Sequence, residues 1–141
     1  MKLKKIRGIQ RENFLLAILK QFQMRGKKET SLTKILESAQ KLDEKITLDY
    51  DFHDKLLYSS AMFHDLDELI FKGYIHEIVY RHDSFLPKRY VTLTGVGNLE
   101  GKQILQNLSE ETKKDLYDSV NFAMQNYAQR WRYWSRPLYN P

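Results

Sequence analysis

Four histidines in the chain are each followed directly by an acidic residue, and these pairs are the first candidates for chemistry. The pairs are His53-Asp54, His64-Asp65, His76-Glu77 and His82-Asp83. Imidazole and carboxylate groups together can bind divalent metals or support phosphate-ester hydrolysis. No two histidines stand four residues apart, which is the spacing that lets one helix face hold a metal through two ring nitrogens. We therefore expect surface ion pairs at these positions and no metal site.

Other catalytic patterns are missing from the sequence as well. The chain has no Cys, which excludes thiol catalysis, thiolate metal sites and disulfides. Gly95-Val96-Gly97 lacks the third glycine and the lysine of a phosphate-binding loop, and the sequence has no G-x-S-x-G nucleophile motif. We expect a protein that is not an enzyme and that needs no cofactor.

Basic residues form the remaining candidate site, because they are concentrated at one end of a chain with a net charge of +5. Residues 1–30 hold nine basic and two acidic groups, whereas residues 31–70 hold four basic and nine acidic groups. Such asymmetry is typical of an end that binds a polyanion. A solvated tail that aids solubility is the alternative. The cluster consists of Lys2, Lys4, Lys5, Arg7, Arg11, Lys27 and Lys28.

Length and composition indicate one soluble domain. A chain of 141 residues can bury its own core, and 42% hydrophobic against 29% charged residues excludes disorder of the whole chain. The longest apolar run, Phe14–Leu19, is far too short to span a bilayer, and no small-residue cleavage site follows it. The lack of Cys is compatible with a reducing compartment. We expect a cytoplasmic protein without a membrane segment.

Hydrophobic periodicity predicts five helices and one hairpin to position these residues. Helices are predicted over Asn13–Met24, from a cap at Thr30 or Ser31 up to Ile46, over Lys55–Lys72, over Asn98–Asn107, and from Ser109 to Pro137. Tyr74–Arg81 and Lys88–Thr92 are rich in Tyr, Ile, Val and Thr, so we expect two strands joined by a tip at residues 82–87. Gly26 and Gly73 stand where helices end.

The order of three helices, one hairpin and two further helices is that of winged helix-turn-helix proteins, and two motifs strengthen the likeness. Leu66–Ile75 resembles the L-x-x-L-x-x-x-G-[LY]-I end of the third helix in winged-helix regulators. Val91–Gly97 resembles the L-T-x-x-G that leaves the second wing strand in the MarR- and PadR-like groups. The resemblance implies a mainly α protein with a small β-hairpin wing (α+β). Residues 1–108 would be the winged-helix domain with its basic arm, and residues 109–141 a long C-terminal helix and aromatic tail.

The same resemblance implies a transcriptional regulator that binds double-stranded DNA as a homodimer, with the third helix in the major groove and the wing on the backbone. The residues that it assigns to DNA are Lys4, Lys5, Arg7, Lys55, Ser59, Ser60, His64, Arg81, Lys88 and Arg89. Asp65, Asp67 and Glu68 would repel phosphates, so we expect them to point away from the DNA. The alternative is a winged-helix module that binds another protein through its acidic third helix and its aromatic C-terminus.

The last helix is predicted to form the dimer interface. Apolar residues recur along it at steps of three and four: Leu116, Val120, Met124, Tyr127, Trp131 and Trp134. Trp, Tyr and Arg are enriched at protein interfaces, which favours dimerisation over the other possibilities. Those are packing on the protein's own body and, for the aromatic and basic tail, stacking of single-stranded bases.

Overall fold

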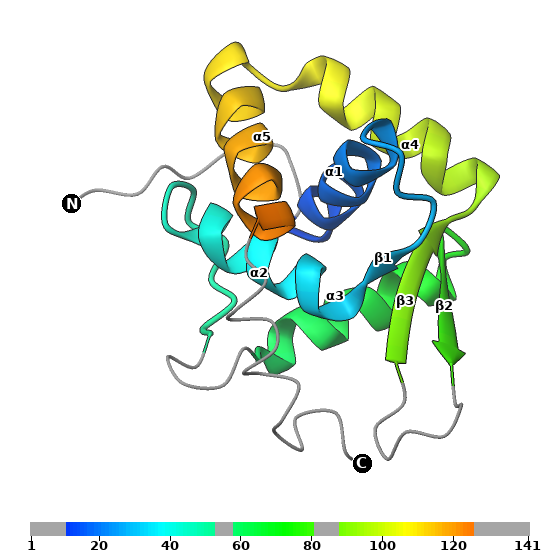
Figure 1. Ribbon diagram of the computed structural model, residues 1–141. Coiled ribbons are helices and arrows are strands. Elements are labelled where there is room, and N and C mark those ends of the chain that lie inside the picture. Colours follow the sequence, from blue (N-terminus) through cyan, green and yellow to red (C-terminus); the bar gives the residue numbers. More distant parts are fainter. Residues whose placement is uncertain (1–10, 53–57, 81–87, 126–141) are drawn as a thin grey trace.

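The computed structural model describes residues 11–52, 58–80 and 88–125, which are mainly helical and include a small three-stranded antiparallel sheet (Figure 1). The elements in chain order are α1 (Arg11–Met24), β1 (Thr30–Ser31), α2 (Leu32–Asp43), α3 (Ser60–Phe71), β2 (Ile75–Tyr80), β3 (Lys88–Leu93), α4 (Gly95–Asn107) and α5 (Glu110–Gln125). The predicted α+β class is confirmed. Within the described ranges, no helix is both long and apolar enough to cross a membrane.

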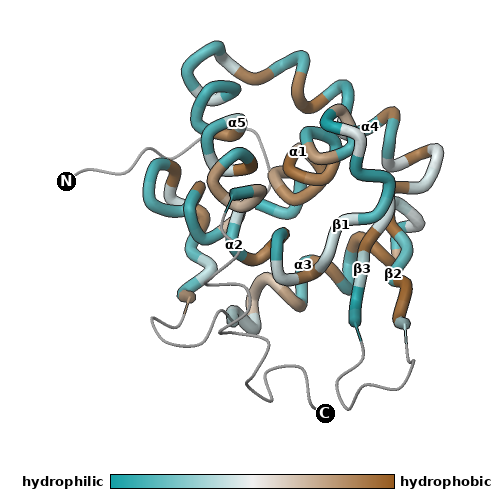
Figure 2. The backbone as a smooth tube through the Cα atoms, viewed as in Figure 1, coloured by the Kyte–Doolittle hydropathy of each residue, from teal (hydrophilic) through white to brown (hydrophobic). Residues whose placement is uncertain are grey.

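Helix α1 is the central element of the core. Its residues Phe14–Leu19 are all buried, as expected for a helix that is hydrophobic on every side. The helix contacts α2, α3, α4, α5 and β3. In Figure 2 its hydrophobic stretch lies in the middle of the molecule, with the other helices around it. The four other helices and β3 therefore share α1 as a packing partner.

The sheet has the strand order β1-β3-β2, and both pairings are antiparallel. Strands β2 and β3 form the predicted hairpin, with Ile75 opposite Leu93 at one end and Tyr80 opposite Lys88 at the other. Strand β1 was not predicted. It is only two residues long, and it becomes a strand because Thr30 and Ser31 pair with Val91 and Tyr90 of β3.

Side-chain caps fix where three helices begin, and the caps of α2 and α5 lie at positions that the sequence predicts. Ser31 Oγ accepts a hydrogen bond from the Lys34 amide, which settles the predicted choice between Thr30 and Ser31. Thr94 caps α4 through the Gly97 amide, and Ser109 caps α5 through the Thr112 amide. Because Thr94 is the cap, α4 begins at Gly95 rather than at the predicted Asn98.

Helix α3 also differs from its prediction at its start. Ser59 has extended backbone dihedrals (φ −149°, ψ 117°), and its hydroxyl accepts a hydrogen bond from the Met62 amide. Helical structure therefore begins at Ser60, later in the chain than the predicted start near Lys55. Lys55 itself lies outside the described residues.

Two glycines allow α4 to pack closely behind the hairpin. A Cβ on Gly97 would lie 1.9 Å from the carbonyl oxygen of Tyr74, and a Cβ on Gly101 would lie 3.1 Å from that of Leu16. Only glycine leaves room for the backbone to approach at Gly97. Helix α4 is thus fitted both to the turn that enters β2 and to α1.

Candidate nucleic-acid interface

Helix α3 and the β2–β3 hairpin lie at one end of the molecule, away from the connection between α4 and α5 (Figure 1). Ser60, His64, Asp67 and Phe71 are exposed on α3. Their spacing of four, three and four residues places them along one stripe of the helix. Two of the residues assigned to DNA, Ser60 and His64, therefore lie side by side on the outer surface of its first half.

Ser59 does not belong to this outward stripe. The residue is only 1% exposed, and its hydroxyl donates to the carbonyl oxygen of Tyr50 while it accepts from the Met62 amide. Both functions of the hydroxyl are satisfied inside the protein. The assignment of Ser59 to DNA binding is therefore wrong, because the residue is a buried helix cap.

Asp65 points into the body of the protein. It is 7% exposed, and its carboxylate accepts from Arg11 Nε at 2.7 Å and from Arg11 Nη2 at 3.2 Å. This hydrogen bond raises the pKa of Arg11. The pairing also corrects the picture of the basic cluster, since the charge of Arg11 is neutralised within the protein and is not available to phosphate.

Arg11 binds the connection between α2 and α3 as well. Its Nη1 donates to the carbonyl oxygen of Asp49 at 3.1 Å, and its guanidinium lies 4.7 Å from the ring centroid of Tyr50. Tyr50 is fully buried, and burial raises the pKa of its hydroxyl. The sequence gives no local signal for this cluster, because its members are brought together only by the fold.

The second half of α3 keeps acidic character at the surface. Asp67 is exposed and Glu68 is half-buried, and within the described residues no cation pairs with Asp67. The nearby Lys72 binds Glu12 of α1, with 3.1 Å from Nζ to Oε2. Asp65 is thus held inside the protein whereas Asp67 lies at the surface, and the expectation that the acids of α3 point away from DNA stays a prediction.

The hairpin presents one freely exposed cation among the described residues. Lys88, the first residue of β3, is exposed and forms no ion pair within the described part of the chain. Arg89 is half-buried, and its Nη1 lies 3.5 Å from Glu77 Oε2 on the neighbouring strand. Lys88 is therefore the better placed of these two predicted phosphate ligands.

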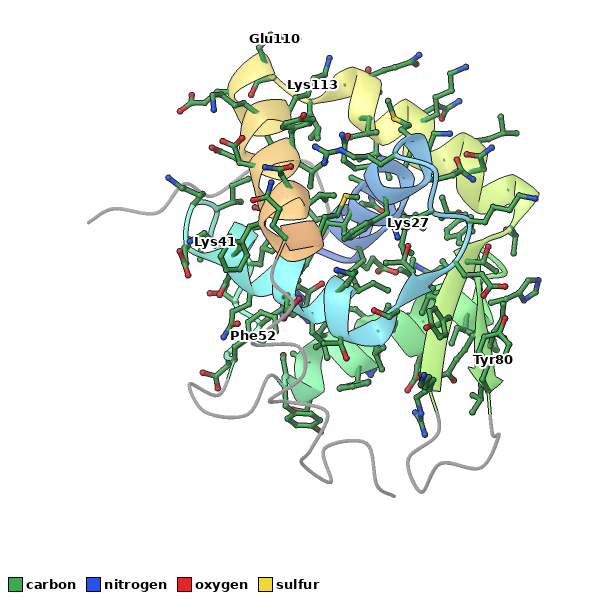
Figure 3. The ribbon with its side chains drawn as sticks, in the orientation of Figure 1. Lys27, Lys41, Phe52, Tyr80, Glu110 and Lys113 are labelled. Atoms are coloured by element: carbon green, nitrogen blue, oxygen red, sulfur yellow. The ribbon has the colours of Figure 1, made fainter. Side chains whose placement is uncertain are left out.

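Lys27 and Lys28 form a second cationic position, beside β1. Both are exposed, and the carbonyl oxygen of Lys28 accepts a hydrogen bond from Thr92 Oγ1 of β3 at 2.9 Å. Figure 3 shows Lys27 on the connection that leads from α1 to β1. Glu29, the next residue in the chain, accepts a hydrogen bond from the Tyr80 hydroxyl at 2.8 Å. Its carboxylate is thereby directed to the sheet.

Several predicted site residues lie outside the described residues: Lys4, Lys5, Arg7, Lys55 and Arg81, together with Tyr127, Trp131 and Trp134. The arm that contains the first three joins the described structure at Arg11. Arg11 itself is bound to Asp65 of α3.

The described part of the predicted dimer interface is occupied by the protein's own core. Leu116 and Val120 have no exposed surface, and they belong to the same hydrophobic cluster as α1 and α2. Met124 is half-buried, packs against that cluster and contacts Arg25, with 3.4 Å between Sδ and Nη1. For Leu116 and Val120 the prediction is wrong, because their apolar stripe faces α1 and α2 rather than a second chain.

Metal ligands are not assembled in the described part of the protein. Within residues 11–52, 58–80 and 88–125, no group of three His, Asp or Glu side chains could hold a metal ion.

Comparisons of the chain with protein-family models, with curated proteins and with solved structures give no significant match. Any functional assignment therefore depends on the residues and the geometry described above.

Proposed function

We propose that this chain is a winged-helix protein that binds double-stranded DNA as a homodimer and regulates transcription. The observation that carries the proposal is the element order helix, strand, helix, helix, strand, strand over α1 to β3, together with a sheet in which β3 lies between β1 and β2. This is the arrangement in which winged-helix proteins present a helix and a hairpin to DNA. The motifs that end α3 and follow β3 support the same fold.

The contacts with DNA come from two described elements. Ser60 and His64 lie in the first half of α3, the half of a recognition helix that reaches base edges. A serine hydroxyl and an imidazole can both donate to and accept from bases in the major groove. Lys88 at the start of β3 binds a backbone phosphate, which positions the protein without reading sequence.

The acidic residues of α3 fit this orientation. Asp65 is neutralised by Arg11, while Asp67 and Glu68 lie in the second half of the helix. A helix that enters the major groove with its first turn keeps its second half farther from the phosphates. The arm at residues 1–10 supplies additional positive charge to the DNA backbone.

Binding to a labelled DNA duplex, measured by fluorescence anisotropy over a range of salt concentrations, tests the proposal. We expect Lys88→Ala to weaken binding and to reduce the slope of log K against log salt by about one unit. The matched control is Lys45→Ala, which removes an exposed cation from the turn after α2 and should leave both quantities unchanged. The proposal fails if the chain does not bind duplex DNA even at low salt.

The homodimer is tested separately, by light scattering of the full chain. The candidates for its interface are the aromatic residues Tyr127, Trp131 and Trp134, which lie outside the described residues. A mass of twice 16.9 kDa is expected, and a monomer at micromolar concentration would remove this part of the proposal.

A second candidate function is a protein-interaction module that docks through α3. It is favoured by Phe71, which is 88% exposed at the end of the outward stripe, and by the uncompensated charge of Asp67. Large exposed apolar residues are characteristic of protein-binding surfaces. Charge reversal of Asp67 and Glu68 separates the two functions, because it abolishes partner binding in the second and strengthens duplex binding in the first.

A further inference from the structure

A hollow lies between the last turns of α1 and α4 and the first two turns of α5. Its volume is about 420 Å³, and the side chains that line it from α1 and α4 are Gln21, Met24, Leu105 and Gln106. In Figure 3, Glu110 and Lys113 lie at the start of α5, at the top of the view. The described residues that line the hollow belong to α1, α4 and α5, so a partner bound there leaves α3 and the hairpin free for DNA.

Apolar surface is exposed at this hollow. Met24, the last residue of α1, is 64% exposed, and Tyr117 of α5 is 49% exposed. Leu105 of α4 lines the hollow and packs against the hydrophobic core behind it. The guanidinium of Arg25 lies 4.1 Å from the ring centroid of Tyr117, which holds this ring in place. Exposed apolar residues within a polar rim are characteristic of protein-binding surfaces.

The rim of the hollow carries charges of both signs. Lys113 Nζ lies 3.2 Å from Glu110 Oε2, and Lys114 Nζ lies 2.8 Å from Asp118 Oδ2. The Glu110 side chain is 91% exposed and that of Lys114 is 75% exposed, so these pairs contribute little to stability and can exchange partners. A partner with charge of one sign would be repelled by one of the two sets. A partner that carries the same pattern in the opposite direction can match both.

We propose that this hollow forms an interface with a second copy of the chain. A two-fold contact uses the same patch on both subunits, so Glu110 of one subunit faces Lys114 of the partner subunit, and the reverse pair forms across the axis. Met24 and Tyr117 are shielded from water at the centre of the contact. The inference rests on the homodimer of the proposed function and assigns its interface to α1, α4 and α5, in addition to the aromatic residues after α5.

Sedimentation equilibrium of the full chain without DNA measures the dimer dissociation constant and tests this inference. We expect Glu110→Lys and Lys114→Glu each to weaken the dimer by about tenfold, because each places like charges opposite one another. The double variant restores opposite charges and should return the constant to within about threefold of that of the unaltered chain. Met24→Glu puts a charge into the apolar centre and should also weaken the dimer by about tenfold. The matched control is Glu44→Lys, because Glu44 forms an exposed pair of the same spacing with Lys41 at the end of α2.

The outcomes separate this inference from the proposed function. A dimer as tight in all these variants as in the unaltered chain overturns the inference and leaves the homodimer standing. Weakening by both single charge reversals without recovery in the double variant overturns the two-fold pairing. A chain that is monomeric at every concentration overturns the inference and the homodimer together, and duplex binding is still decided by anisotropy. A dimer that responds to the variants as expected supports the inference even if the chain does not bind duplex DNA. If circular dichroism shows that Met24→Glu is unfolded, the reversals at the exposed Glu110 and Lys114 decide the result.

Discussion

The guanidinium of Arg11 holds the carboxylate of Asp65 through two hydrogen bonds that link residues 54 positions apart in the sequence. The pair connects the first residue of α1 to the inner side of α3. Arg11 is also the residue at which the basic arm joins the described structure. One ion pair therefore ties the start of α1 to α3, in addition to the packing of α3 on the core.

Breaking this pair is expected to destabilise the protein. Asp65→Ala leaves the Arg11 charge without its main partner, at a cost of about 2 kcal/mol in the free energy of unfolding. The cost is below that of a fully buried pair, because 33% of the Arg11 side chain is exposed. In urea unfolding followed by circular dichroism, the double variant with Arg11→Ala should lose less than the sum of the two single variants. Additive losses would show that the residues are not coupled. Lys114→Ala, which breaks the exposed pair with Asp118, serves as the control.

The close packing of α4 makes a second prediction. Gly97→Ala places a methyl group against the rigid backbone of Tyr74, so we expect a loss of about 3 kcal/mol in the free energy of unfolding. Gly101→Ala, with a contact of 3.1 Å, should lose less. Gly95→Ala is the matched control, since nothing lies within 4 Å of its Cβ and alanine favours the helix. In urea unfolding, the loss of stability should be largest for Gly97→Ala, smaller for Gly101→Ala and smallest for Gly95→Ala. Any other order would contradict the packing geometry.

The burial of α5 predicts that Leu116 contributes to folding and not to dimerisation. Leu116→Ala removes a fully buried side chain, and the expected loss is about 3 kcal/mol in the free energy of unfolding. Light scattering of the folded variant should give the same mass as the unaltered chain. Tyr117→Ala, at the exposed neighbouring position, is the control and should lose much less stability. If Leu116→Ala changed the mass but not the free energy of unfolding, this would indicate that Leu116 lies in a dimer interface.

Most of the fold could be predicted from the sequence because its signals are local. The caps Ser31, Thr94 and Ser109 lie within three residues of the amides they bind, and Gly26 and Gly73 adopt positive φ where their helices end. Strand β1 has no such signal. Two residues are too few for alternation to be recognised, and only pairing with β3 makes them a strand.

The candidate site was less predictable, because residue type does not tell which side of an element faces solvent. Ser60 and His64 are exposed as predicted, yet the adjacent Ser59 is a buried cap. Leu116 and Val120 of α5 form an apolar stripe, as the periodicity predicts, but they pack in the protein's own core and not against a second chain. The link between Arg11 and Asp65 depends on how α1 packs on α3, which no local pattern encodes.

The acidic connection after α2 makes stability depend on pH. Burial raises the pKa of Asp43 above its ordinary value of 3.8, while its Oδ1 accepts from the Leu48 amide at 2.8 Å. As pH rises from below 3.8, the Asp43 carboxyl loses its proton in the unfolded chain before it does so in the folded protein. The folded state therefore loses stability as pH rises. Asp43→Asn keeps the acceptor oxygen and cannot ionise. We expect it to stabilise the protein at about pH 7 and to make little difference at about pH 3.

Urea unfolding at both pH values checks the prediction for Asp43. Asp51→Asn removes an exposed carboxylate from the same connection and serves as the control, with little change expected at either pH. Its backbone has φ 56°, a conformation that asparagine also tolerates. If Asp43→Asn raised the free energy of unfolding more at the acidic pH, this would mean that folding lowers the pKa of Asp43 instead of raising it.

The exposed carboxylate of Asp67 tests how α3 faces DNA. It lies on the same stripe as Ser60 and His64, so removing its charge reduces repulsion of the phosphates. We expect Asp67→Asn to tighten binding of a blunt duplex by about two- to fivefold at low salt, and the gain to shrink as added salt screens the charge. Anisotropy titrations over a range of salt concentrations measure both effects, with Asp51→Asn as a control for an acid outside α3. Weaker binding by Asp67→Asn would contradict the proposed orientation, because it would mean that the carboxylate accepts a hydrogen bond from a cytosine amino group.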